Sequence, residues 1–192
     1  MSKVVVMECD KAVKQSFTQA LKLIRIDDLN TREKPVVVKV GNFNPKAEIC
    51  TTVSLVDAIT NAFDRTPKIF LAESDSYNGE ALKRLQIWNK VFNARVIPFS
   101  LSTDKNIREV KIADEKIPFS HILFKPNVFI STHVPRRYEN AGIKDLMNMG
   151  SILKNLLGLI PDIKKDRFHE KLATALLDIY EAIGGIDLAV LD

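Results

Sequence analysis

The sequence predicts an α/β fold, with a layered, mostly parallel or mixed sheet flanked by helices. Short β-branched runs alternate along the chain with longer segments whose apolar residues recur at helical spacing. The strand candidates are apolar almost throughout, as strands are when helices cover both faces of a parallel sheet. At 192 residues, the length favours one domain, and we expect a single α/β domain over residues 1–192.

The strands are expected where β-branched and aromatic residues cluster between polar turns. Residues 108–113 alternate in polarity, which predicts an edge strand or a hairpin. The chain stops directly after the last strand candidate, so we expect it to be a piece of a longer protein. In chain order the candidates are residues 3–8, 35–40, 68–73, 94–99, 108–113, 121–126, 128–133 and 186–192.

Helices are expected between these strands, where apolar residues recur every third or fourth position. One helix is expected over residues 79–92, with Leu82, Leu85, Trp88 and Phe92 facing inward. Polar residues that can cap a helix N-terminus precede three segments, and a glycine pair that accepts the left-handed conformation follows the last. The expected N-caps are Asp10, Thr51 or Thr52, and Asp166, and the glycine pair is Gly184 and Gly185.

Composition excludes several classes of partner. Twenty-eight basic and 24 acidic residues give a formal net charge of +4, and the phenylalanines lie in apolar segments, not between basic residues. We therefore expect no nucleic-acid partner and regard small anions as better suited to the modest positive charge. The N-terminal apolar run is too short for a signal peptide, and no stretch approaches the roughly 20 residues of a membrane span. We expect a cytoplasmic protein with no membrane contact.

The two cysteines, Cys9 and Cys50, are too few for an iron–sulfur cluster or an all-cysteine zinc site. We expect both to be reduced core residues, because the chain shows no export signal. No paired-histidine or Cys-x-x-Cys spacing predicts a metal site. A glycine-rich phosphate loop and a nucleophile elbow are missing as well, so the cofactor stays unknown.

Three lysine–asparagine pairs are the main candidates for a binding site. Ligands of open α/β sheets bind outside the carboxyl ends of the strands, where several polar groups of this chain are expected. Lysine offers a point charge for a carboxylate or phosphate, and asparagine can orient a ligand or bond its own backbone. We expect the three lysines to converge at one rim of the sheet; the alternative is that each pair only forms a turn. The pairs are Lys39 with Asn42, Lys125 with Asn127, and Lys154 with Asn155.

Two histidines are candidate proton carriers. His133 follows a strand and His169 lies in the first turn of the last expected helix. Each could serve as a general acid or base, with Lys154 as a third catalytic candidate, or could be a surface or capping residue. Lys164, Lys165 and Arg167 gather near a helix N-terminus, where cations are disfavoured unless an anion binds there.

Five segments carry a family resemblance: VVVKVGNFNP…TTVSLVDAI, IFLAESDS, FSHILFKPNVFISTHV, GSILKNLLGLIPDIKKDRFHEKL and GGIDLAVLD. From about residue 35 onward they resemble the family known as domain of unknown function 362 (DUF362). The resemblance implies an α/β domain that relatives often join to a ferredoxin-like domain carrying iron–sulfur clusters. It also implies that the chain is truncated at its C-terminus, because relatives continue beyond the Asp at the end of the last strand.

The resemblance also implies site residues, because several positions match motifs of the family. One pair stands where relatives have Lys-Pro-Asn, two threonines match the one that opens the next helix, and the others match directly. These residues are Lys39, Asn42, Thr51, Thr52, Lys125, Asn127, Lys154, Asn155 and His169.

Three functions are left open by the sequence. The first is an enzyme domain acting on a small anionic metabolite, with lysines neutralising charge, asparagines orienting the ligand and a histidine moving a proton. The second is a non-catalytic docking domain for an iron–sulfur redox partner, and the third is a structural subunit. Convergent, partly buried Lys, Asn and His side chains would favour the enzyme, whereas a flat exposed face would favour docking. The oligomeric state stays open.

Overall fold

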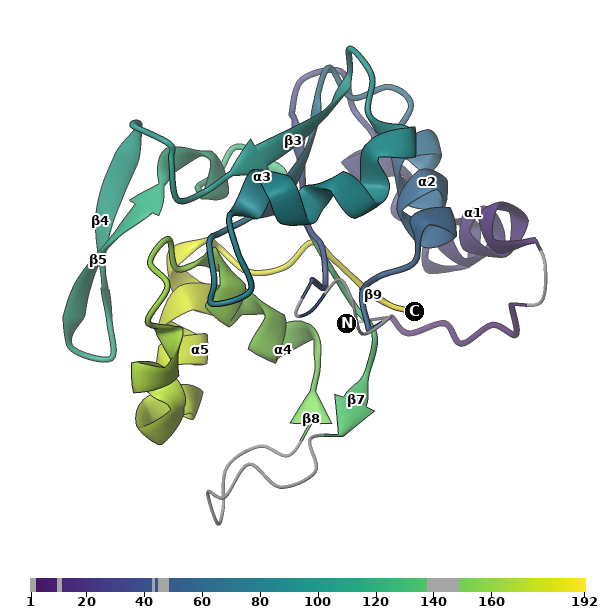
Figure 1. Ribbon diagram of the computed structural model, residues 1–192. Coiled ribbons are helices and arrows are strands. Elements are labelled where there is room, and N and C mark those ends of the chain that lie inside the picture. The colour runs from purple at the N-terminus through teal and green to yellow at the C-terminus, as the bar shows by residue number, and fades with distance from the viewer. Residues whose placement is uncertain (1–2, 10–11, 43, 45–48, 138–148) are drawn as a thin grey trace.

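The centre of the molecule is a five-stranded sheet in the order β3-β2-β1-β6-β9, in which all neighbouring strands are parallel (Figure 1). The computed structural model describes residues 3–9, 12–42, 44, 49–137 and 149–192. Helices flank the sheet, so the predicted α/β class is confirmed. The strands are β1 (Val36–Lys39), β2 (Ile69–Glu73), β3 (Val96–Ser100), β6 (Val128–His133) and β9 (Leu188–Leu191).

Each face of the sheet has its own hydrophobic core, because successive residues of a strand point to opposite faces. Val36 and Val38 belong to one core, and Val37 belongs to the other. Figure 1 shows α1 and α2 to one side of the sheet and α4 and α5 to the other. The first core is covered by α1 (Val13–Ile24), α2 (Val53–Ala62) and the 3-10 helix η3 (Leu85–Val91). The second is covered by η5 (Leu156–Leu159), η6 (Lys165–Lys171), α5 (Leu172–Ala182) and the hairpin β4 (Ile107–Ile112)–β5 (Glu115–Ser120).

The strand order reverses between β1 and β6. The chain runs from β1 outward through β2 to β3 along the first face, then returns to place β6 on the other side of β1. The connection from β6 to β9 passes over the second face and includes α4 (Ile152–Asn155). A reversal of this kind leaves a crevice at the carboxyl ends of the two central strands, where open α/β sheets bind their ligands. The remaining elements are η1 (Asp27–Leu29), α3 (Ala81–Arg84), η4 (His121–Leu123), β7 (Arg136–Arg137) and β8 (Met149–Gly150).

Two strand predictions are wrong. Residues 3–8 form no strand, and their apolar side chains are exposed, with Val4 at 85% and Val6 at 92% of full exposure. Residues 121–126 form η4 and a turn. Asn127 closes that turn, because its side-chain amide donates to the Ile122 and Phe124 carbonyl oxygens at 2.8 and 3.2 Å. A side chain that bonds nearby backbone in this way competes with a sheet ladder.

The helix expected over residues 79–92 is two shorter elements, α3 and η3, and the backbone at Trp88 departs from helical geometry. Leu82 is exposed and not inward-facing, because the buried stripe runs through Ala81, Arg84 and Leu85 instead. The hairpin expected around residues 108–113 is confirmed as β4–β5.

Among the helix boundaries, Thr52 is the N-cap of α2 as predicted, with its hydroxyl accepting from the Leu55 amide at 3.3 Å. Asp166 is not an N-cap, since it lies inside η6, which Lys164 precedes. Gly184 and Gly185 follow α5 with φ of +77° and +84°, which confirms the left-handed ending. The predicted cap Asp10 lies outside the described residues.

Cys9 is exposed and Cys50 is partly buried, so the expected core position is wrong for Cys9; both carry free thiols. Over the part of the chain that the structure describes, none of the helices combines the length and apolar character that crossing a bilayer requires.

Candidate site at the carboxyl ends of β1 and β6

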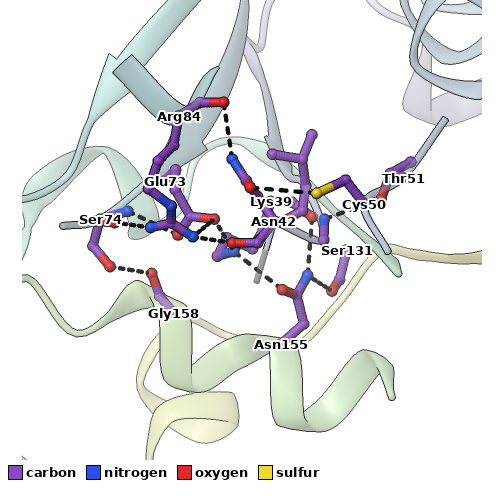
Figure 2. A network of polar contacts seen from close by, with 12 residues as sticks. Lys39, Asn42, Cys50, Thr51, Glu73, Ser74, Arg84, Ser131, Asn155 and Gly158 are labelled. Atoms are coloured by element: carbon purple, nitrogen blue, oxygen red, sulfur yellow. Dashed lines mark hydrogen bonds and ion pairs between the residues drawn. The ribbon is translucent and has the colours of Figure 1, made fainter. Parts of the chain in front are cut away.

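Lys39 is the last residue of β1 and is almost completely buried, with 1% of its surface exposed. Its ammonium group donates to the Val40 carbonyl oxygen at 2.8 Å, to Glu73 Oε2 at 3.1 Å and to Asn155 Oδ1 at 3.1 Å (Figure 2). An ammonium group has three protons, and three acceptors surround this one. Burial lowers the pKa of Lys39, and the carboxylate of Glu73 opposes that shift.

Glu73 at the end of β2 holds two cations. Its Oε2 lies 3.1 Å from Lys39 Nζ and 3.7 Å from Arg84 Nη2, and all three side chains are buried. Arg84 donates to the Ser74 carbonyl oxygen at 2.9 Å and also to the carbonyl oxygen of Asn42. Asn42 returns a hydrogen bond from its side chain to the Arg84 carbonyl oxygen at 3.1 Å. The segments that follow β1 and β2 are therefore joined through α3.

Asn155, the last residue of α4, bridges the two central strands β1 and β6 (Figure 2). Its side-chain nitrogen lies 3.1 Å from the Lys39 carbonyl oxygen, 3.2 Å from Ser131 Oγ and 3.1 Å from the Thr132 carbonyl oxygen. Because Lys39 and Ser131 are register partners of β1 and β6, this amide closes the end of that strand pair. Thr51 adds a second bridge, since its hydroxyl accepts from the Gly41 amide at 3.0 Å and contacts the Thr132 hydroxyl at 3.2 Å.

Gly158 allows η5 to approach the buried lysine. A Cβ at this position would lie 2.7 Å from Lys39 Cε and 2.9 Å from Lys39 Nζ. The neighbouring Ser74 hydroxyl donates to the Gly158 carbonyl oxygen at 2.6 Å. A side chain at position 158 would therefore displace a lysine whose three hydrogen bonds fix its position.

His133 ends β6 with 4% of its surface exposed, and within the part of the chain that the structure describes neither ring nitrogen has a hydrogen-bond partner. Burial, together with the nearby charges of Arg136, Lys39 and Lys154, lowers the pKa of His133 to about 4. The ring is therefore neutral at pH 7.

Further basic side chains lie around this point, and burial is the main cause that lowers the pKa of each. Burial and Arg136 lower the pKa of Lys154, while burial and Lys154 lower that of His169. Lys165 donates to the Asp75 carbonyl oxygen, and burial lowers its pKa to about 8. A positive charge that lowers the pKa of a neighbouring basic group indicates a region of positive potential, which favours an anion.

The expected convergence of the three lysines is wrong for one pair. Lys125 and Asn127 precede β6 and so lie at the amino end of the sheet, away from Lys39. There Lys125 forms an ion pair with Asp187, which also accepts from the Phe129 amide at 2.7 Å. Thr52 lies on the carboxyl side, but its backbone amide and hydroxyl are both bonded to the Asp192 carboxylate. Of the predicted residues, Lys39, Asn42, Thr51 and Asn155 belong to one network of hydrogen bonds and ion pairs. His133 ends β6 beside it, and Lys154 lies next to Asn155 on α4. His169 lies on η6, where burial and the charge of Lys154 lower its pKa.

Sequence reasoning missed the role of two buried charges. Neither Glu73 nor Arg84 was among the predicted site residues. A signal for Arg84 exists, because it stands three residues after Ala81 and four before Trp88, on the stripe that the structure buries. Within the described residues, no three His, Cys, Asp or Glu side chains group as metal ligands would.

A comparison with protein families places most of this chain in a family. The model described as domain of unknown function (DUF362) matches residues 34–192. That range begins just before β1 and contains all five strands of the sheet and every residue of the site described above. No curated protein matches the chain.

Proposed function

This chain belongs to the family of domain of unknown function 362 (DUF362), and we propose that it is an enzyme domain that binds a small anionic metabolite at the carboxyl ends of β1 and β6. The observation that carries the proposal is the convergence of basic side chains at the end of β6, where Arg136 Nε and His133 Nε2 each lie 3.1 Å from the position that a Cβ would take on Gly150. Burial and the neighbouring positive charges lower the pKa values of His133 and Lys154, as they would where a site attracts an anion. The strand reversal between β1 and β6 supports the same location.

The side chains divide into two groups in this proposal. Lys39 is surrounded by three acceptors, so it positions the site and does not contact the ligand. Asn155 holds β1 to β6 in the same way. Lys154 and Arg136 supply the charge that attracts the anion, since a guanidinium group and an ammonium group both bind carboxylate and phosphate.

The histidines are the groups that could transfer protons if the domain is an enzyme. His133 is neutral at pH 7, and a neutral imidazole can take a proton from a bound molecule. His169 lies within the influence of Lys154 and is the second proton carrier in this proposal. Docking to an iron–sulfur protein stays a prediction from the family resemblance, with no specific contact that favours it.

Thermal unfolding with added anions tests the binding. We expect sodium phosphate or sodium citrate to raise the unfolding midpoint above that in sodium chloride of equal ionic strength. A ligand at 100 times its Kd adds about 2.7 kcal/mol to the free energy of unfolding. Lys154→Met should remove most of this gain, since it deletes a charge at the site.

The matched control is Lys125→Met, the same substitution at the amino end of the sheet. It should leave the anion-dependent gain unchanged, whatever it does to basal stability. Equal midpoints in phosphate, citrate and chloride would overturn the proposal, and so would an equal loss of the gain in both variants.

A further inference from the structure

His133 differs from the other buried polar side chains of the site, because it has contacts but no hydrogen bonds. A Cβ on Gly41 would lie 2.6 Å from His133 Nδ1, and a Cβ on Gly150 would lie 3.1 Å from His133 Nε2. Each ring nitrogen thus faces a glycine, and neither meets a donor or acceptor among the described residues. The glycines let the backbone approach the ring closely, because a side chain at position 41 would collide with the ring and one at position 150 would crowd it.

An unpaired imidazole is costly as a structural residue. A buried polar group without a partner costs about 1–3 kcal/mol, and a phenylalanine would fill the same space without that cost. Neighbouring side chains each form at least one hydrogen bond: Thr132, for example, shares one with Thr51, and Arg84 donates to the Ser74 carbonyl oxygen although its Nε has no partner among the described residues. A buried side chain with no hydrogen bond at all calls for an explanation, and a ligand or a catalytic role is one.

The neutral ring also adds a property that its neighbours lack. Arg136 and Lys154 can only donate hydrogen bonds, whereas a neutral histidine has one nitrogen that accepts. The Glu73 carboxylate is already engaged by Lys39 and the Ser74 amide. His133 is therefore an acceptor without a partner in a region otherwise rich in donors.

One of the donors lies close to the unpaired acceptor. The Cβ position of Gly150 lies 3.1 Å from Arg136 Nε and 3.1 Å from His133 Nε2, so the two nitrogens converge on the same glycine. Building on the anion binding proposed above, we propose that the ligand is an anion that also carries a hydroxyl group, and that this hydroxyl donates to His133. The cations would bind the charged group, and the histidine would select for the hydroxyl.

Matched pairs of anions test this selection by isothermal titration calorimetry on the full 192-residue chain. Malate and succinate differ by one hydroxyl on a dicarboxylate, and glycerol 3-phosphate and propyl phosphate differ by hydroxyls on a phosphate ester. We expect the hydroxylated member of at least one pair to bind about 10-fold more tightly or better, as one buried hydrogen bond allows. The pair that shows the preference identifies carboxylate or phosphate as the charged group.

Two variants separate the hydroxyl contact from the charge. His133→Phe keeps a ring between the two glycines, and it should abolish the hydroxyl preference while leaving the binding of the plain anion within about 3-fold. Lys154→Met should weaken both members of a pair and preserve their ratio. A preference that survives in His133→Phe would overturn the assignment of the hydroxyl to His133.

A measurement on the unaltered protein covers the case in which His133→Phe fails to fold. In NMR spectra, the chemical shifts of the His133 ring nitrogens should change when the hydroxylated anion is added. They should change much less when the matched anion without the hydroxyl is added. Equal affinity within both pairs, or equal ring shifts, would overturn this inference while leaving anion binding intact. Binding of none of the four anions would instead overturn the proposed function itself.

Discussion

The two ends of the central sheet each contain a lysine, an asparagine and an acidic partner, yet the two sets differ in burial. At the carboxyl end, the side chains of Lys39 and Glu73 are 2% and 3% exposed. At the amino end, those of Lys125 and Asp187 are 37% and 27% exposed. The same lysine–asparagine pattern therefore places its lysine in an enclosed network at one end and in a partly exposed ion pair at the other. What separates them is position, since Lys39 ends a strand and Lys125 precedes one.

How much an ion pair contributes to the free energy of unfolding depends on its burial. An exposed pair contributes about 0–1 kcal/mol, because water screens it and two long side chains lose freedom. Breaking a buried pair costs about 3–5 kcal/mol, since it leaves a charge without compensation. Variants made in matched pairs at the two ends measure this contrast directly.

The largest effect is expected for Glu73→Gln. Removing this carboxylate leaves Lys39 and Arg84 buried without their acidic partner, and the free energy of unfolding should fall by about 3–5 kcal/mol. Asp187→Asn should cost about 1 kcal/mol or less, because the pair is partly exposed and the amide oxygen can still accept from Phe129. Urea denaturation measures the free energy of unfolding of both variants. Equal losses would contradict the proposed difference between the buried and the partly exposed ion pair.

The asparagines offer the second comparison. Asn155→Ala removes contacts to both central strands and to Lys39, and we expect a loss of about 2–4 kcal/mol. Asn127→Ala removes two hydrogen bonds within one turn, and a loss of about 1–2 kcal/mol is expected. Denaturant midpoints with unchanged slopes would give both values. A larger loss for Asn127 than for Asn155 would contradict the assigned roles.

Acid should destabilise the carboxyl end through His133. Burial and the neighbouring positive charges hold the pKa of His133 at about 4 in the folded protein, below its ordinary value of 6.5. Between these two pH values the unfolded chain therefore binds a proton that the folded protein does not. Stability from this group is complete above pH 6.5 and is lost as the pH falls toward 4, on the order of 2–3 kcal/mol. Carboxylates titrate in the same range, so the measure is the difference between the wild-type and His133→Phe stability curves. Parallel curves would show that His133 does not titrate in this way.

The smallest effect is expected for Lys125→Met. Its ion pair is partly exposed, and we expect a change of about 0–1 kcal/mol in the free energy of unfolding. Raising the salt concentration should reduce even this difference, because exposed pairs are screened. Thermal unfolding at low and high salt would measure it, and a loss comparable to that of Glu73→Gln would refute the contrast.

Much of the sheet could be predicted because its strands are apolar runs covered on both faces. Residues 3–8 have the same character and fail, since a strand also needs a neighbour, which a local pattern does not specify. Residues 121–126 fail because the side chain of Asn127 takes up two of the carbonyl groups that a ladder would use.

The candidate site was less predictable, since its groups come from distant segments. His133, Lys154 and Asn155 stand out in the sequence as polar groups in apolar surroundings, and the structure brings them near Lys39. Lys125 also belongs to a lysine–asparagine pair, but it lies at the amino end of the sheet. Arg84 looks like an ordinary charged residue of a helix until the fold shows that it faces inward to Glu73. Whether a charged side chain is buried depends on tertiary contacts, and local sequence patterns do not specify these.

The bond between Lys39 and Asn155 joins residues 116 positions apart and has a consequence for the order of folding. During synthesis, Lys39, Glu73 and Arg84 leave the ribosome long before Asn155, so the early chain has no amide to close β1 onto β6. Long-range contacts form late, after the entropy of closing the intervening loop has been overcome. The candidate site should therefore be one of the last parts of the molecule to form, and partly synthesised chains should expose strand edges there that chaperones can bind.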